Sequence, residues 1–466
     1  MKIEIRNLGV VQQAEIDLKP LTIFVGPNNT GKTWVANTLL AVLGSYGWNR
    51  YLKAYAAGEL EDEYPPLDAA IQQLVNEGNA KIDLVQFTDE YEETYINSVA
   101  RLAQHWMHEF MNTERISFDD LEICVRLEKT KERLLESVRA YSIDKSVASG
   151  RQKTRPLLSF LKEPGEPTLF LYAETKGSVL EELPLRAIKT LLSGETFMAL
   201  HRSLYRDFFA FPTERTTFIT WRPSMELEEV ETFEIPRRPK IERRFAEPLR
   251  YFVNLLMECF WSSQAAREEQ AEDNPKIRDY ICLAELMENR ILRGGLDFST
   301  SEPEPQRDLL FRPVGEVALD MPVVSSMVKE LSPLVIYLRY AAAPGDWLVI
   351  DEPEMNLHPE AQVRLVEFLA MLIYSGLHIL VTTHSPYLVD HLVNLMKAAE
   401  HKDKETLREK FYLQSTEAFI PRGQVSVYLF ENGTVRNILD EEGLVEWGTF
   451  GRVSDRIGQI YHELCK

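Results

Sequence analysis

The sequence predicts an α/β fold in which segments from the two ends of the chain build one domain around a parallel sheet. Three runs have the apolar, β-rich character of buried strands: Leu21 to Val25 near the start, and Trp347 to Ile350 and His378 to Thr382 near the end. Helix patterns follow the first two of these runs, at Lys32 to Leu43 and Pro359 to Tyr374. Strands that alternate with helices indicate a parallel sheet covered by those helices.

The middle of the chain is predicted to be a large, mainly helical insertion. Two short strand-like runs, Leu121 to Leu127 and Thr168 to Tyr172, interrupt long amphipathic patterns. Those patterns cover Ser98 to Met111, Leu185 to Leu204, Glu247 to Glu269 and Lys276 to Leu292. We therefore expect residues 1–97 and 311–466 to form the two parts of the α/β domain, and residues 98–310 to form an insertion or lid.

Length and composition indicate a large globular chain. Its 466 residues, 45% of them hydrophobic, suffice to bury one large core and an attached lobe. No run approaches the roughly 18 apolar residues of a membrane span, and the N-terminus lacks the apolar core of a signal peptide. We therefore expect a cytoplasmic protein that does not contact membranes. The cysteines, Cys124, Cys259, Cys282 and Cys465, lie too far apart for a zinc or disulfide framework.

The charge balance disfavours capture of DNA by the whole surface. The chain has 52 basic and 72 acidic residues, a net charge of −20, whereas affinity for nucleic acid comes largely from neutralised phosphates. Basic residues gather in two short stretches, one with Arg151, Lys153 and Arg155 and the other with Arg237, Arg238, Lys240, Arg243 and Arg244. Each stretch is either a solvated loop that offsets acidic neighbours or a contact for phosphate or a partner.

The strongest motif lies at the junction of the first predicted strand and helix. Its residues are Gly26, Pro27, Asn28, Asn29, Thr30, Gly31, Lys32 and Thr33, which match G-x-x-x-x-G-K-[ST]. Glycines let the loop backbone wrap phosphates closely, and N–H groups at the helix N-terminus attract anions. Lys32 would neutralise the outer phosphates of ATP, and the Thr33 hydroxyl would bind Mg²⁺. The strand before and the helix after favour this interpretation over a chance glycine turn.

Two adjacent carboxylates, Asp351 and Glu352, follow the apolar run Leu348 to Ile350. The carboxyl end of a parallel strand is where such sheets bind ligands. In this position Asp351 would contact Mg²⁺ through water, and Glu352 would act as the base that polarises the water attacking the γ-phosphate. An acidic pair after a strand is also typical of a helix N-cap, but the P-loop favours the catalytic interpretation.

Three stretches of the sequence together resemble a known family. Residues 5–9 (IRNLG) lead to the P-loop, residues 351–362 read DEPEMNLHPEAQ, and residues 382–388 read TTHSPYL. They lie within about the first 45 and about the last 150 residues. These sequence motifs resemble those of the OLD/RecF-like branch of ABC-type ATPases, particularly those of bacterial anti-phage defence systems. Residues 211–215 (FPTER) are similar to a P-x-E-R segment of these proteins.

This resemblance implies an ABC-type P-loop ATPase head that uses ATP and Mg²⁺. His384 is similar to the switch histidine that reaches the γ-phosphate in such enzymes, although a lone histidine after a strand is usually structural. Asn356 to Pro359 resembles the segment that lines the opposite nucleotide, and Pro359 also suits the first turn of the following helix. Because ABC-type sites are completed by a second subunit, the resemblance also implies head-to-tail homo-oligomers.

The signature helix departs from the wider superfamily. Where a serine-glycine-glycine pattern is expected, the sequence has Ser325 and Ser326 and no glycine. Their hydroxyls either face a γ-phosphate across a dimer, with Lys329 adding positive charge, or simply cap a surface helix. We therefore expect ATP to bind and its hydrolysis to be slow.

In size and layout the chain resembles the ATPase subunits of the PARIS and Septu systems. The expected function is that of a sensor or scaffold subunit that controls a separate effector nuclease of the Toprim or HNH type. Residues 385–466 are short for a nuclease in addition to the last strands of the ATPase, which places that activity in a partner. One alternative is a RecF-like DNA-maintenance ATPase that clamps DNA directly, and another is a nucleotide-binding scaffold with little turnover.

Overall fold

The computed structural model of the chain describes residues 1–127, 131–148, 156–173, 184–220, 245–299, 308–445, 456 and 459–463. Contacts divide the chain into two compact units. The first holds residues 1–6, 41–106 and 119–207, and the second holds residues 7–40, 107–118 and 208–466. This division differs from the predicted one because the second unit includes residues 208–310. Both basic stretches of the sequence, at residues 151–155 and 237–244, lie outside the described residues.

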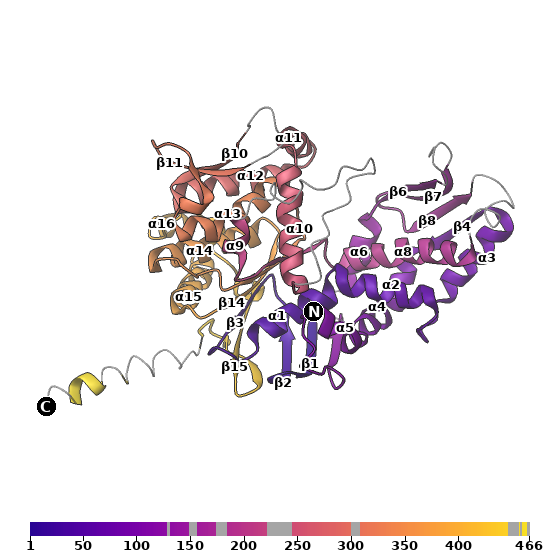
Figure 1. The fold of residues 1–466 in the computed structure, drawn as a ribbon, viewed down its shortest axis with the longest axis horizontal. Helices are drawn as coiled ribbons and strands as arrows, with labels where there is room; N and C mark the ends of the chain where they lie inside the picture. Colours follow the sequence, from indigo (N-terminus) through magenta and orange to yellow (C-terminus); the bar gives the residue numbers. More distant parts are fainter. Residues whose placement is uncertain are drawn as a thin grey trace. The chain divides into compact units, whose positions relative to one another are not determined.

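A largely parallel sheet forms the centre of the second unit. Its strands run in the order β2 (Val11–Asp17), β16 (Thr434–Asn437), β15 (Val425–Glu431), β3 (Leu21–Val25), β14 (His378–Thr383), β13 (Trp347–Asp351) and β9 (Phe208–Phe211). The five strands from β15 to β9 are parallel to one another. Strand β3, from the start of the chain, lies between β14 and β15 from its end (Figure 1). The predicted fold class, a P-loop ATPase head assembled from both ends of the chain, is confirmed.

The central strands are buried on both faces, which explains why their sequences are continuous apolar runs. Every residue of β3 and β13 is buried. Helices contribute to the same core: α10 (Glu247–Trp261), α12 (Pro275–Met287), α13 (Ser326–Tyr340), α14 (Pro359–Tyr374) and α15 (Pro386–Glu400). Helix α14 and helix α1 (Lys32–Leu43) have the predicted bounds.

Smaller elements complete the second unit and correct two of the predicted helices. The helix expected from Glu247 to Glu269 is two helices, because Ser262 ends the first and Ser263 caps the second. The helix expected from Lys276 to Leu292 ends at Met287 and continues as a π-helical turn. The remaining elements are α9 (Arg215–Ile219), α11 (Gln264–Asp273), α16 (Lys404–Arg408), β10 (Gly294–Phe298), β11 (Leu309–Pro313) and β12 (Leu319–Asp320).

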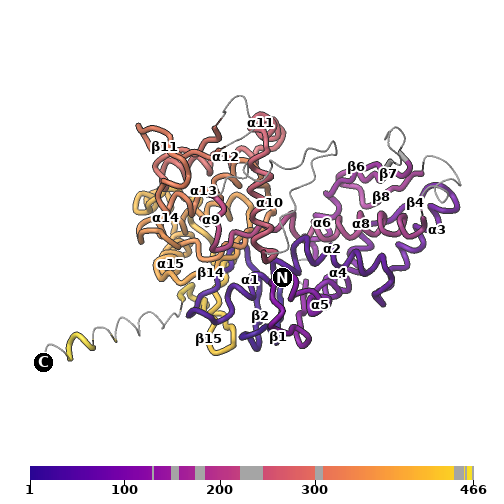
Figure 2. Tube along the Cα trace, in the orientation of Figure 1, coloured from indigo at the N-terminus to yellow at the C-terminus, as the bar shows by residue number. Residues whose placement is uncertain are grey.

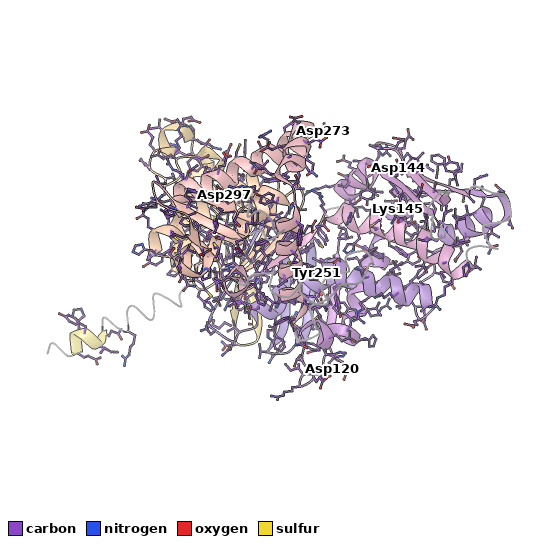
Figure 3. All side chains as sticks on the ribbon, turned by 45° about the horizontal axis from the view of Figure 1, so that its top comes forward. Asp120, Asp144, Lys145, Tyr251, Asp273 and Asp297 are labelled. Atoms are coloured by element: carbon purple, nitrogen blue, oxygen red, sulfur yellow. The ribbon has the colours of Figure 1, made fainter. Side chains whose placement is uncertain are left out.

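The first unit contains a sheet of which the sequence predicted only one strand, the run from Thr168 to Tyr172. Its antiparallel strands run in the order β4 (Asn79–Asp83), β8 (Thr168–Ala173), β7 (Pro156–Lys162) and β6 (Ile143–Ala148). Residues Lys2–Arg6 of β1 (Lys2–Leu8) pair antiparallel with β5 (Glu122–Arg126), and these two strands extend the larger sheet beyond β2. Figure 3 labels Asp144 and Lys145 in the region of β6. Lys145 forms an ion pair with Glu195 of α8.

Helices form the rest of the first unit. They are α2 (Ser45–Ala57), α3 (Pro65–Glu77), α4 (Leu84–Arg101), α6 (Lys131–Ala140) and α8 (Leu185–Leu204), of which α2, α4 and α8 pack together (Figure 2). Helix α8 has the predicted bounds, whereas the helix expected from Ser98 to Met111 is divided between α4 and α5 (Ala103–Phe110). Aromatic rings fill the core of this unit, and the hydroxyls of Tyr51 and Tyr64 lie 2.7 Å apart inside it. Among all described residues, no helix has the length and apolar character needed to cross a membrane.

Candidate nucleotide-binding site

Four loops of the second unit meet at the carboxyl edge of its parallel strands. The P-loop follows β3, Asp351 ends β13 and is followed by Glu352, and His384 follows β14. The fourth loop follows β9 and leads to Arg215. Parallel strands that end at one edge therefore bring together residues that are more than three hundred positions apart in sequence.

The P-loop wraps closely because its glycines adopt conformations that other residues avoid. Gly26 has φ +144° and Gly31 has φ +94°. A Cβ atom on Gly26 would lie 2.4 Å from the carbonyl oxygen of Phe430 on β15. Lys32 closes the loop, since its Nζ donates to the carbonyl oxygens of Gly26 at 3.0 Å and Pro27 at 2.9 Å. Burial lowers the pKa of Lys32, and the nearby carboxylate of Glu352 opposes that shift.

Asp351 is held beside the P-loop by two threonine hydroxyls. Thr33 Oγ1 donates to Asp351 Oδ1 at 2.9 Å, and Thr382 on β14 donates to the same oxygen. Burial raises the pKa of Asp351, and both hydroxyl hydrogen bonds lower it by stabilising the charged form. The described residues contain no group of three or more His, Cys, Asp or Glu side chains arranged to bind a metal ion. One carboxylate and one hydroxyl nevertheless suit Mg²⁺, which binds through few protein ligands and keeps several waters.

Glu352 and His384 contact each other at one end of the pocket. His384 Nε2 lies 3.2 Å from Glu352 Oε1, and both side chains are partly exposed. The hydrogen bond from His384 lowers the pKa of Glu352; burial opposes that shift, and the charges of His384 and Lys32 add to it. The carboxylate is therefore ionised at neutral pH and able to accept a proton. Glu352 has φ +46°, an uncommon conformation for a residue other than glycine.

Glu354 fixes the backbone that carries His384. One of its carboxylate oxygens accepts hydrogen bonds from Thr383 Oγ1 at 2.6 Å and from the backbone N–H of His384 at 2.7 Å. Burial raises the pKa of Glu354, and these hydrogen bonds oppose the rise. A second link joins Ser385 Oγ to Gln362 of α14 at 2.6 Å. These hydrogen bonds hold the loop that carries His384 in place.

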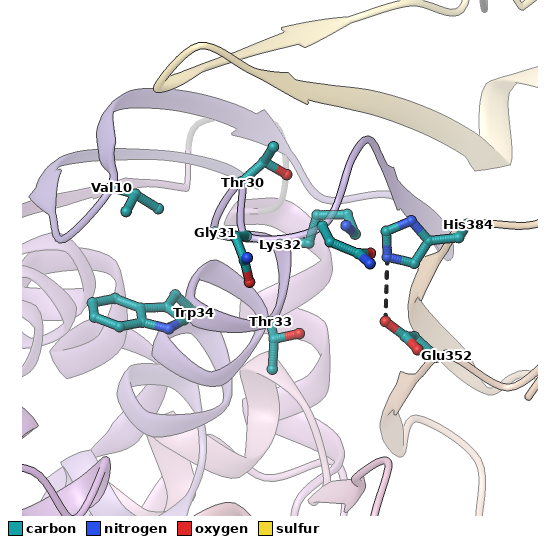
Figure 4. Close-up of a pocket in the computed structure, with 10 residues that line it drawn as sticks. Val10, Thr30, Gly31, Lys32, Thr33, Trp34, Glu352 and His384 are labelled. Carbon is teal, nitrogen blue, oxygen red and sulfur yellow. Dashed lines mark ion pairs between the residues drawn. The ribbon is translucent and has the colours of Figure 1, made fainter. Parts of the chain in front are cut away.

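A pocket of about 550 Å³ opens over the P-loop. Its lining consists of Val10, Asn28, Asn29, Thr30, Gly31, Lys32, Thr33, Trp34, Glu352 and His384. Figure 4 shows Val10 and Trp34 on one side of Lys32, with Glu352 and His384 on the other. The motifs predicted every polar residue of this lining. They did not predict Val10 and Trp34, which belong to none of the motifs.

Ser325 and Ser326 do not line this pocket. Both are exposed at the N-terminus of α13, where Ser325 Oγ accepts a hydrogen bond from Val328 N at 3.4 Å as an N-cap. Lys329, one turn later, donates to the carbonyl oxygen of Pro322 at 2.7 Å. Within one chain, Ser325 therefore caps the helix and Ser326 begins it, and a role at a nucleotide requires the site of another subunit.

Arg215, the last residue of the FPTER segment, lies at the centre of these loops. Its side chain is only 2% exposed. Nη1 donates to the carbonyl oxygen of Asp351 at 2.6 Å, and Nη2 donates to that of Glu352 at 2.9 Å. The sequence contained this signal, but only the parallel pairing of β9 with β13 shows what the arginine contacts.

Comparisons with known protein families agree with this geometry. A family model described as "AAA ATPase domain" matches residues 1–143. Another, described as "AAA domain, putative AbiEii toxin, Type IV TA system", matches residues 234–390. The chain carries an ATPase domain of the AAA/ABC type. No curated protein matches it.

Solved structures of SMC head domains are similar to this chain at a distance. One is a head bound to the C-terminal winged-helix domain of ScpA, with 12% identity, 95% of this chain and 98% of that chain covered, and a TM-score of 0.34. A second, a head with an extended coiled coil bound to a ScpA domain from Pyrococcus furiosus, has 11% identity, 100% and 99% coverage and a TM-score of 0.35. The head from Thermotoga maritima has 9% identity, 94% and 97% coverage and a TM-score of 0.30. Likenesses this distant carry no argument about activity or partners.

Proposed function

We propose that the chain binds ATP with Mg²⁺ and hydrolyses it slowly, as the sensor or scaffold subunit of an anti-phage defence complex that controls a separate nuclease. The observation that carries the ATPase part is the pocket itself. It places the cation of Lys32, the hydroxyl of Thr33 and the carboxylate of Glu352 around one space. These are the positive charge, metal ligand and proton acceptor that phosphoryl transfer to water uses.

The residues at the two ends of the pocket indicate how the nucleotide is oriented in it. Glu352 and His384 belong at the γ-phosphate, where water attacks, and Lys32 and the P-loop amides bind the phosphates between. The adenine base of the nucleotide then lies at the other end of the pocket, beside Val10 and Trp34 (Figure 4). Gly9 leaves room for the indole ring of Trp34, because a Cβ on Gly9 would lie 2.1 Å from that ring. An aromatic and an aliphatic side chain suit a flat, largely apolar base.

Each polar side chain of the pocket has one part in the reaction. Mg²⁺, when bound through Thr33 and Asp351, would neutralise phosphate charge. Lys32 would exchange the loop carbonyls for phosphate oxygens when the nucleotide enters. Glu352 would take the proton of the attacking water, and the ring of His384 would orient that carboxylate and donate to the γ-phosphate.

Several observations support the defence role. The motifs resemble those of ATPases from anti-phage systems, and the family description that matches residues 234–390 names a putative toxin of a type IV TA system. The net charge of −20 opposes direct clamping of DNA. Ser325 and Ser326 are exposed outside their own pocket, which leaves them able to complete the site of a second copy in a head-to-tail dimer. The effector would be a nuclease of the Toprim or HNH type in a partner chain.

Two substitutions separate binding from hydrolysis. Lys32→Ala should lower ATP affinity by more than about 100-fold, because it removes the charge that faces the phosphates. Glu352→Gln should keep ATP affinity within about 3-fold while hydrolysis falls by about 100-fold or more, because the amide cannot accept the proton. Equilibrium binding of labelled ATP and phosphate release measure the two effects.

The matched control is Glu360→Gln, an exposed carboxylate on α14 outside the pocket, which should change neither quantity. Turnover by Glu352→Gln at the wild-type rate would exclude Glu352 as the base. The defence role has its own test. Co-expression with the neighbouring genes should yield a complex with a nuclease that protects cells from phage, and that protection should depend on Lys32.

A further inference from the structure

Arg215 occupies an unusual position for a charged side chain. It begins the short helix α9 directly after β9, and its guanidinium is buried beneath the loop that carries Asp351 and Glu352. Removing a charge from water is costly, so a buried arginine persists where its hydrogen bonds have a specific use. Here they reach backbone carbonyl oxygens on both catalytic carboxylate residues, at 2.6 Å for Asp351 and 2.9 Å for Glu352.

The peptide groups of Glu352 are held on both sides. Its carbonyl oxygen accepts from Arg215, and its N–H donates to the carbonyl oxygen of Thr382 at 3.0 Å. A residue with φ +46° is strained by about 1 kcal/mol or more, and such a conformation persists only where surrounding contacts enforce it. The N–H of Met355 also donates to this carbonyl oxygen, at 3.2 Å. Without the shorter, charged hydrogen bond from Arg215, the peptide after Glu352 could rotate and carry the carboxylate away from His384.

Glu330 connects this arrangement to helix α13. Its carboxylate, also buried, forms an ion pair with Arg215 Nη2 and accepts a long hydrogen bond of 3.4 Å from Asn356 Nδ2. Glu330 lies on the same helix as Ser325 and Ser326, about one turn after its start. One buried pair therefore links the carboxylate loop after β13 to the helix whose exposed end is proposed to meet a second subunit.

We infer that Arg215 is a positioning residue for hydrolysis, which fixes the backbone of Glu352 in its catalytic conformation and, through Glu330, ties that conformation to helix α13. The inference rests on the proposed ATPase function. Arg215 does not line the nucleotide pocket, so ATP should bind without it. Hydrolysis should suffer, because a displacement of about 1 Å at a catalytic group lowers rates by about 100-fold.

The test replaces the whole pair, since removing one partner would leave a buried charge and unfold the protein. In Arg215→Met/Glu330→Met, apolar side chains of similar length fill the space. We expect this variant to bind ATP within about 3-fold of wild type and to lose about 10-fold or more in kcat. Arg215→Lys keeps the charge but has a single donor nitrogen. Its kcat should lie between that of wild type and that of Arg215→Met/Glu330→Met.

A second ion pair, between the partly buried Arg339 of α13 and the buried Glu288 of the π-helical turn, provides the control. Arg339 pairs with Glu288 and donates to the carbonyl oxygen of Leu296 at 2.7 Å, without contacting the loop after β13. Arg339→Met/Glu288→Met should cost similar stability in thermal unfolding and keep kcat within about 3-fold.

Three outcomes would overturn the inference. The Arg215→Met/Glu330→Met variant could hydrolyse ATP as fast as the control. Alternatively, it could lose ATP affinity in proportion to kcat, or fail to fold while Arg215→Lys shows wild-type kcat, and either result would make Arg215 a structural residue only. Wild-type protein in the same assay separates this from the proposed function, because a wild type that does not hydrolyse ATP refutes the ATPase proposal first.

Discussion

At the scale of single residues, the contact between His384 and Glu352 defines how the site responds to pH. The hydrogen bond from His384 is the largest cause of the lowered pKa of Glu352. A carboxylate whose pKa is lower in the folded than in the unfolded state stabilises the fold above its unfolded pKa. That stabilisation is lost as the pH falls through the folded pKa. The same protonation removes the proposed base, so activity and this part of the stability decline together on the acid side.

His384→Asn tests this coupling. Loss of the imidazole should raise the pKa of Glu352, so the acid limb of the kcat profile should move to higher pH, with a fall of about 10-fold or more at neutral pH from the lost contact with the γ-phosphate. Rates of phosphate release across a pH series measure both effects. His391 pairs with Glu367 at 2.8 Å outside the pocket, and His391→Asn should leave the limb in place. If the acid limb does not move in His384→Asn, the contact between His384 and Glu352 does not determine the pH of that limb.

At the scale of elements, the P-loop depends on how closely β3 lies against β15. The two strands pair in parallel with Val25 opposite Leu429, so the turn at Gly26 passes directly beside the backbone of Phe430. A backbone neighbour cannot rotate away as a side chain can. The glycine is therefore required by the packing of the sheet as well as by the phosphate.

Gly26→Ala should lower the free energy of unfolding by about 1–3 kcal/mol and weaken ATP binding, because its Cβ forces β3 and β15 apart. Urea unfolding and ATP titration measure the two effects. Gly295→Ala on β10, where a Cβ meets no atom within 4 Å, is the matched control. An unchanged unfolding midpoint for Gly26→Ala would mean that the loop relaxes at no cost.

At the scale of the whole molecule, the proposed reaction needs two copies of the chain. The pocket contains the P-loop, Glu352 and His384, but the serines of α13 are exposed elsewhere on the same unit. A closed head-to-tail dimer would bring each pair of serines to the other copy's nucleotide. Such a dimer has two composite sites, and each takes its P-loop and its serines from different chains.

Mixing two inactive variants tests this arrangement. Ser325→Arg/Ser326→Arg keeps an intact P-loop, and Lys32→Ala keeps intact serines. If the serines act across the dimer, an equal mixture should regain about a quarter of wild-type hydrolysis, because half of the dimers are mixed and each has one complete site. Ser263→Arg, at the exposed N-cap of α11, is the control for a charged cap and should be active alone. A mixture no more active than its parents would contradict the head-to-tail proposal.

The sequence by itself determined the chemistry of the pocket. The P-loop, the carboxylates Asp351 and Glu352 and the histidine His384 were all found from motif spelling and from the apolar strands before them. The bounds of α1, α8 and α14 followed from helical periodicity. These features are local: phosphate binding requires glycines at fixed spacing, and a buried parallel strand requires a continuous apolar run.

Only the tertiary structure decided which distant residues support that chemistry. Val10 and Trp34 reach the site because β2 and β3 belong to one sheet, and no motif marks them. The antiparallel sheet of the first unit was missed because its strands are short and separated by helices and loops. Arg215 belongs to the FPTER segment, which the sequence marked, but its proposed role depends on the pairing of β9 with β13. That pairing brings Arg215 to Asp351, 136 positions away. Such long-range pairing depends on the packing of the whole core rather than on any single segment.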